Sequence, residues 1–208
     1  MAPELILQTF TIGSLNLDLY VPDPESTKAW YAMEKSLDPE TPFPFWAKVW
    51  PSAIVMAEYL QENPEIVKGK KVLELAAGLG LPALVAAQYA EKVCCSDYLE
   101  KAVDVARQSV LHNRLPNIDC HVYNWNHLPD DLSADILLMC DVNYEPDEFD
   151  QLTTIFERFL LRGTTIILST PGRIMAKEFV IRIDGWCTEK HIASFSPDTQ
   201  IFLYVLKR

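Results

Sequence analysis

The residues with the clearest chemical potential form a short glycine-containing segment, VLELAAGLGLPA, at positions 72–83. Small residues between a strand and a helix let a ligand approach the backbone closely. The helix N-terminus then offers unpaired N–H groups and the positive end of its dipole. Pro82 suits that position because its missing N–H would have had no partner there. The segment therefore predicts a cofactor loop after a strand that ends near Glu74.

Two cofactors are compatible with the glycine spacing alone. Gly78-x-Gly80-x-x-Ala83 satisfies a dinucleotide fingerprint, and Asp97 lies near the place of its ribose-binding acid. A carboxylate at Glu74 would repel a pyrophosphate held against the loop. S-adenosylmethionine (SAM) instead brings a sulfonium and an amino group, which an acid attracts directly or through water. The charge of Glu74 thus favours SAM.

Asp97 is the second candidate cofactor residue. It follows Val93-Cys94-Cys95-Ser96, at the expected end of the next strand, where a carboxylate can accept both ribose hydroxyls. The alternative is that Asp97 caps the helix that starts near Leu99. The strand–loop–helix context favours the ribose role.

The pattern around these residues predicts an α/β fold of alternating strands and helices. Strands are expected at 71–75, 92–96, 119–123, 135–140 and 164–169, with helices at 52–62, 81–89, 99–113, 147–161 and 176–184. Such alternation predicts a three-layer, Rossmann-like and mostly parallel sheet with helices on both faces. Two final strands, 186–192 and 200–207, have no helix between them and should pair antiparallel at one edge.

The first 45 residues look like an extension that packs on the core. Residues 5–21 alternate in polarity around Gly13-Ser14, which predicts a β-hairpin, and residues 29–37 have the pattern of a short helix. We therefore expect a hairpin extension over 1–45 and the cofactor-binding domain over 46–208.

Composition restricts the partners. Eighteen Lys and Arg against 29 Asp and Glu give a net charge of −11. This charge argues against nucleic acid as a partner and suits a basic protein, although solubility alone would explain it.

The longest apolar stretches are far shorter than the roughly 20 residues of a membrane helix. The N-terminus lacks the pattern of a secretory signal, so we expect a cytoplasmic protein without membrane contact, and a monomer. The five cysteines have no metal-like spacing with histidine, and we expect them to be reduced and no metal to be bound.

Taken in order, the motifs resemble the seven-strand, Rossmann-like SAM-dependent methyltransferases. They are most similar to the lysine-methyltransferase-like branch, whose members were often first labelled nicotinamide N-methyltransferase-like. The matching features are Trp50-Pro51, the 74–80 loop, Asp97, Asn124-Trp125 and Asp141-Val142-Asn143-Tyr144. The resemblance covers residues 45–169 and extends to the N-terminal hairpin.

The resemblance implies a role for each matched position. The cofactor would contact Trp50, Glu74, Ala76, Gly78, Gly80, Asp97, Tyr98, Asn124, Trp125 and Cys140. Trp50 would close over it, and Asn124-Trp125 would border the adenine. Asp141 and Tyr144 would face the methyl-transfer site as the catalytic residues.

Several of these positions have simpler readings or depart from the pattern. Trp50 could be a core residue, Trp125 could cover the sheet edge, and Asp141 could cap a turn ahead of Asp147, itself the expected N-cap of the next helix. Ala76 stands where a glycine is usual and would cost on the order of 1 kcal/mol if its φ is positive.

The implied activity is N-methyl transfer from SAM, with a protein lysine as the favoured acceptor and a small amine as the alternative. Transfer requires the protein to align the nucleophile and exclude water. Asp141 would position the amine, and Tyr144 with the ring of Trp46 or Trp50 would surround the cation. An NAD-dependent oxidoreductase and a non-catalytic interaction module are further alternatives. The first lacks a recognisable hydride-transfer site in the sequence.

Overall fold

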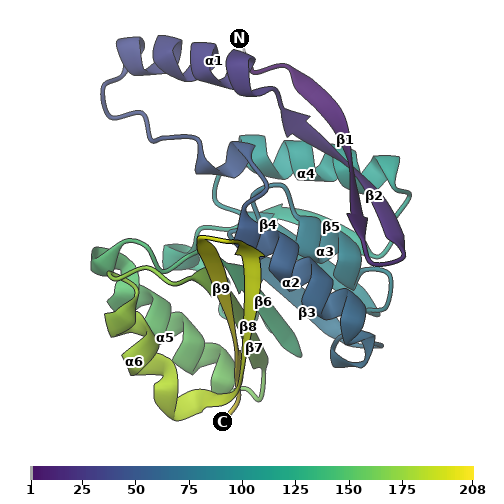
Figure 1. The fold of residues 1–208 in the computed structure, drawn as a ribbon, viewed down its shortest axis with the longest axis vertical. Helices are drawn as coiled ribbons and strands as arrows, with labels where there is room; N and C mark the ends of the chain where they lie inside the picture. Colours follow the sequence, from purple (N-terminus) through teal and green to yellow (C-terminus); the bar gives the residue numbers. More distant parts are fainter. Residues whose placement is uncertain (1) are drawn as a thin grey trace.

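A computed structural model describes residues 2–208 and contains a seven-stranded sheet and a separate β-hairpin (Figure 1). The sheet order is β5-β4-β3-β6-β7-β9-β8. Its strands are β3 (Lys71–Leu75), β4 (Lys92–Asp97), β5 (Ile118–Val122), β6 (Ile136–Cys140), β7 (Thr165–Pro171), β8 (Cys187–Ser196) and β9 (Thr199–Leu206). β3 to β7 are parallel, and β9 pairs antiparallel with both β7 and β8.

Both faces of the sheet are buried because the central strands are apolar on both sides. Along β3, Val72 packs toward one core, whereas Leu73 and Leu75 pack toward the other. The first core also contains α2 (Pro51–Glu62), α3 (Leu81–Ala86) and α4 (Glu100–His112), and the second contains α5 (Phe149–Leu160) and α6 (Lys177–Ile183). Figure 1 shows these helices on opposite sides of the sheet, so the predicted three-layer fold with an antiparallel edge pair is confirmed.

The N-terminal extension begins with the predicted hairpin, β1 (Leu5–Ile12) and β2 (Leu15–Pro22), around Gly13 at φ 57°. β2 is attached to α4 through Asn113, whose Nδ2 donates to the Asp18 carbonyl at 2.6 Å, and through Ser109, whose Oγ accepts from Tyr20 N at 3.0 Å. Helix α1 (Pro24–Leu37) follows and has no buried residue. Figure 1 shows it at the far end of the molecule from the C-terminus.

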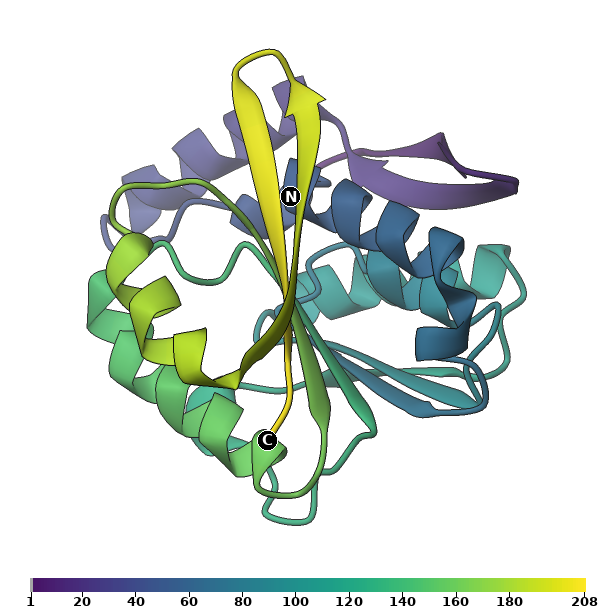
Figure 2. The same cartoon turned by 60° about the horizontal axis from the view of Figure 1, so that its bottom comes forward.

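Some predicted boundaries differ from the structure. Helix α1 begins five residues before the predicted start at residue 29, because Asp23 accepts from Ser26 N at 2.8 Å and Pro24 fits the first turn. The prediction that Asp147 caps α5 is wrong. Asp147 lies inside a 3₁₀ turn over Pro146–Glu148 that precedes the helix. Strand β8 is longer than the predicted 186–192, and Figure 2 shows the β8–β9 hairpin extending beyond the body of the molecule.

No helix within residues 2–208 is both long enough and apolar enough to cross a membrane.

Candidate functional site

A cavity of about 640 Å³ lies at the carboxyl ends of the parallel strands. The chain leaves β3 toward β4 on one side, whereas β6 pairs with β3 on the other. In open α/β sheets, this reversal of strand order leaves a crevice in which ligands bind. The segments that follow β3, β4, β5 and β6 all line the cavity, and its size falls in the range of roughly 300–1,000 Å³ typical of small-molecule sites.

The loop after β3 has left-handed backbone at alternate residues. Ala76, Gly78 and Gly80 have φ values of 54°, 54° and 74°. A side chain at Gly80 is excluded for a second reason, because its Cβ would lie 2.8 Å from Cys95 Sγ. Ala76 therefore occupies the conformation in which alanine is strained, and all three residues line the cavity.

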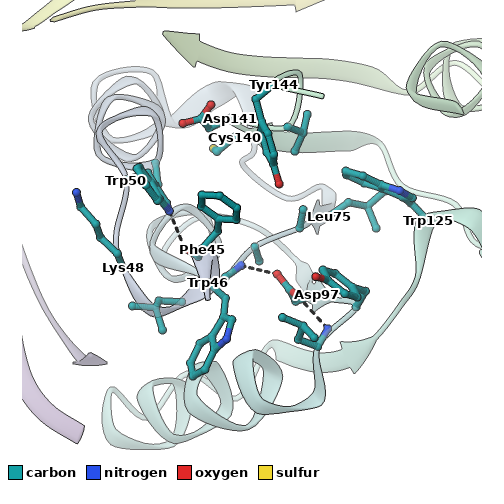
Figure 3. Close-up of a pocket in the computed structure, with 18 of the residues that line it drawn as sticks. Phe45, Trp46, Lys48, Trp50, Leu75, Asp97, Trp125, Cys140, Asp141 and Tyr144 are labelled. Atoms are coloured by element: carbon teal, nitrogen blue, oxygen red, sulfur yellow. Dashed lines mark hydrogen bonds between the residues drawn. The ribbon is translucent and has the colours of Figure 1, made fainter. Parts of the chain in front are cut away.

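Asp97 at the end of β4 holds this loop in place (Figure 3). Its Oδ2 accepts from Gly78 N at 2.9 Å and its Oδ1 accepts from Leu99 N at 3.0 Å. Burial raises the pKa of Asp97, and the Leu99 and Gly78 donors oppose that shift. Each carboxylate oxygen has more than one lone pair. The bond to the helix start and a contact with a ligand in the cavity are therefore compatible.

Glu74 has a different position from the one predicted. It is 1% exposed, does not line the cavity, and accepts from Ala83 N at 2.8 Å beneath the start of α3. Burial raises the pKa of Glu74 to about 8, so its carboxyl is mostly protonated at neutral pH. The inference that the charge of Glu74 selects the cofactor is therefore wrong, because desolvation outweighs what the sequence suggested.

Negative charge in the cavity comes from other residues. Four acidic side chains line it, namely Asp97, Asp141, Glu145 and Glu148, against the cationic Lys48 and Arg173. Lys48 Nζ lies 4.7 Å from the centre of the Trp50 ring. The excess of carboxylates favours a ligand that carries positive charge.

The two residues predicted to border the adenine both line the cavity, as does Tyr98. Asn124 Oδ1 accepts from Asn126 N at 2.9 Å and so caps the 3₁₀ turn Trp125–His127. Trp125 is half-buried against the second core, as its alternative role required, yet its ring also faces the cavity (Figure 3). Both residues can contribute to a flat, partly apolar binding surface.

Aromatic side chains cover another side of the cavity. Trp50 Nε1 donates to the Phe45 carbonyl at 2.7 Å, which fixes the indole at the N-terminus of α2. The Phe45 ring centre lies 6.1 Å from that of Trp50 and 5.6 Å from that of Tyr144. Figure 3 shows Phe45 and Tyr144 between Asp141 and Cys140 on one side and Asp97 on the other. Trp50 is therefore half-buried at the cavity wall and is not a core residue.

Asp141 and Tyr144 lie together after β6, as predicted, but Asp141 already has a partner. Its carboxylate forms a two-pronged ion pair with Arg173, in which Nη1 donates to Oδ1 and Nη2 donates to Oδ2 at 3.0 Å. The guanidinium carbon lies 5.9 Å from the Tyr144 ring centre. Burial raises the pKa of Tyr144 to about 12, so its hydroxyl stays protonated. Tyr144 thus offers a ring and a proton donor, and it is unsuited to act as a base.

Sequence reasoning missed several cavity residues. Arg173 belongs to none of the sequence motifs, because its pairing with Asp141 joins residues 32 positions apart and leaves no local pattern. Phe45 is 45% exposed and does not belong to an amphipathic pattern, so nothing in the sequence indicated its place at the cavity. Tyr123 and Asn126 also line the cavity, and their position at the end of β5 was the signal that could have identified them.

Comparisons with known proteins agree with this geometry. The fold is that of the seven-strand methyltransferases. The Thermus thermophilus 16S rRNA N2 G1207 methyltransferase RsmC, solved with AdoMet and guanosine, matches with a TM-score of 0.67 and 18% identity over 99% of this chain and 52% of that one. A profile of the lysine methyltransferase family matches residues 45–186. The chain belongs to that family, as the sequence motifs predicted.

Two curated relatives illustrate the range of acceptors in such proteins. The human histone-arginine methyltransferase METTL23 is 40% identical over 115 residues, which are 52% of this chain and 60% of that protein. The human electron transfer flavoprotein beta subunit lysine methyltransferase is 30% identical over 132 residues, 62% of this chain and 50% of that protein. The chain spans about half the length of the curated relatives it matches.

The strained backbone at Ala76 predicts that replacing this residue changes the stability of the fold. Ala76→Gly should raise the free energy of unfolding by on the order of 1 kcal/mol, because glycine adopts a φ of 54° without the Cβ clash. Urea unfolding followed by circular dichroism measures this. Ala77, which is not among the residues with positive φ, supplies the control. Ala77→Gly should destabilise the protein, and equal effects of the two changes would reject strain at Ala76.

The burial of Glu74 predicts that the stability of the fold depends on pH. Its pKa in the folded protein is about 8, against 4.5 for an ordinary glutamate. The stability it contributes is therefore fully present below about pH 4.5 and is lost as the pH rises through 8. Glu74→Gln keeps an oxygen for Ala83 N but cannot ionise. Between pH 5 and pH 9 the free energy of unfolding of the wild type should therefore fall, relative to that of Glu74→Gln, by on the order of a few kcal/mol. Parallel stability curves in urea across this range would show that Glu74 does not titrate as described.

Proposed function

We propose that this chain is a SAM-dependent N-methyltransferase that modifies a side chain of a protein. A single cavity carries the proposal, since it connects the loop after β3 and Asp97 with Asp141 and Tyr144 after β6. A cofactor and an acceptor can therefore meet within one space. Membership of the lysine methyltransferase family supports the same activity.

The residues of the cavity fit SAM. The left-handed loop residues bring backbone within reach of a ligand, and Gly80 has no room for a side chain. Asp97 would accept the ribose hydroxyls, and Asn124 and Trp125 would border the adenine. The excess of carboxylates suits the positive charge of the sulfonium and of the amino group. When bound, SAM supplies a methyl group already activated for displacement.

A protein lysine is the favoured acceptor because of the family to which the chain belongs. Asp141 would orient the lysine nitrogen, while Phe45 and Tyr144 would enclose its alkyl chain and exclude water. A carboxylate favours the charged amine, so its role is positioning, and a desolvating aromatic wall assists loss of the proton before attack. Tyr144 remains neutral and presents its ring to the cation.

A protein arginine is a second candidate acceptor, and one observation favours it. Asp141 and Tyr144 together already hold a guanidinium, that of Arg173, in the two-pronged geometry that arginine and carboxylate prefer. The histone-arginine activity named for METTL23 is consistent with such a site. Labelling of lysine or of arginine in the product distinguishes the two acceptors.

The cofactor assignment predicts the effect of Asp97→Ala. Loss of a carboxylate that accepts ribose hydroxyls should weaken SAM binding on the order of tenfold to a hundredfold, given about 1.5–3 kcal/mol for hydrogen bonds to charged groups. Isothermal calorimetry measures this, with circular dichroism to confirm folding. Asp104→Ala is a matched control, because Asp104 is an exposed residue of α4 that pairs with Arg107 outside the cavity. Equal SAM affinity in wild type and Asp97→Ala would overturn the ribose role.

The acceptor assignment predicts that Asp141→Ala abolishes methyl transfer while SAM affinity stays within a few-fold. Asp141→Asn is the better matched variant, since asparagine tolerates the φ of 55° at this position. The assay incubates each protein with labelled SAM and a lysate of the source organism, and mass spectrometry then identifies the labelled protein and residue. Full turnover by Asp141→Asn would reject the role of this carboxylate.

A further inference from the structure

Arg173 lies in the turn between β7 and α6, and its guanidinium reaches back over the end of β6. Both of its terminal nitrogens donate to Asp141, and its guanidinium carbon lies 5.9 Å from the Tyr144 ring centre. Within residues 2–208, Asp141 is the one side chain with which Arg173 forms an ion pair or hydrogen bond. The Arg173 guanidinium thus engages both the carboxylate and the ring to which the acceptor role was assigned.

A carboxylate that accepts from both terminal nitrogens of one guanidinium keeps spare lone pairs, but it cannot form the same two-pronged pair with a second cation. We propose that Arg173 is an internal competitor for the acceptor subsite, so that a cationic side chain of the substrate has to displace it before transfer. This inference rests on the proposed function, because it takes Asp141 and Tyr144 as the acceptor site. It makes Arg173 a specificity-determining residue, since an acceptor that holds Asp141 weakly does not displace a guanidinium.

The alternative role is that Arg173 holds Asp141 in place, but the backbone around Asp141 is fixed by other contacts. Asp141 N donates to the Ser169 carbonyl at 2.8 Å, at the junction of β6 and β7. Asn143 is fully buried and accepts from Thr170 Oγ1 at 2.6 Å. The segment is therefore anchored to β7 on both sides of buried Val142 without help from Arg173.

The Arg173 side chain also has room to leave. It is 33% exposed, whereas the Asp141 side chain is 10% exposed. The next two residues, Ile174 and Met175, are 83% and 53% exposed, so solvent surrounds the turn. Buried Ala176 and Phe179 anchor the start of α6. A rotation of the Arg173 side chain can therefore open the subsite while the core remains packed.

The test uses methylguanidinium as a probe of the open subsite, with binding followed by the fluorescence of the cavity tryptophans and by NMR. In the paired state Arg173 binds Asp141, and in the open state it has rotated away. If the paired state is about ten times more populated than the open state, Arg173→Ala should bind the probe about tenfold more tightly than wild type. Arg173→Lys, which cannot form a two-pronged pair, should lie between them. Arg182→Ala is the control, because it removes the same charge from α6, where Arg182 pairs with Asp150 and Glu178.

Binding of methylguanidinium needs no methyl transfer, so this result is separate from the success of the proposed function. If the wild type neither binds SAM nor transfers a methyl group, the proposed function is contradicted, whereas the competitor role of Arg173 is not. Equal affinity for the probe in wild type and Arg173→Ala, or an equal gain in Arg182→Ala, would overturn the competitor role. With an identified acceptor, the same inference predicts a lower KM and an undiminished kcat in Arg173→Ala, and a lower kcat at unchanged KM would contradict it.

Discussion

The geometry of the site depends on how the chain turns from β3 into α3 between Leu75 and Leu81. The chain makes this turn with left-handed backbone angles at Ala76, Gly78 and Gly80. The turn is then attached to β4, because Ala77 N donates to the Ser96 carbonyl at 2.9 Å. The adjoining strand ends are also joined, since Ser96 Oγ donates to the Glu74 carbonyl at 2.8 Å. A loop fixed in this way leaves its exposed side free to form the floor of a cavity.

The placement of the cavity was predictable because it follows from local patterns. Alternation of apolar strands and helices indicates a parallel sheet, and a parallel sheet brings the carboxyl ends of its strands to one edge. Residues near the ends of strands, such as Asp97, Trp125 and Asp141, could therefore be grouped from the sequence alone. The length of α1 was less predictable, since its face has no buried residue to produce a pattern.

The electrostatics of the site could not be predicted from the order of residues. Whether Glu74 carries a charge depends on its burial beneath α3, and whether Asp141 is free depends on a turn 32 residues away. Both are properties of the packed state, because desolvation and pairing compete only once the neighbours are in place. The acidic character expected near the loop survives, but other carboxylates supply it, among them Glu145 and Glu148.

The two strands at the centre of the sheet end in the same way. Ala76 follows β3 at a φ of 54°, and Asp141 follows β6 at a φ of 55°. β3 and β6 are parallel neighbours, so both chains leave the sheet through a left-handed residue at the point where the strand order reverses. These turns direct the following segments away from each other and leave the crevice between them. At the second position, aspartate tolerates the left-handed angle better than most residues and also supplies a carboxylate. The backbone and the proposed chemistry therefore favour the same residue at Asp141, whereas alanine at position 76 goes against the backbone preference for glycine.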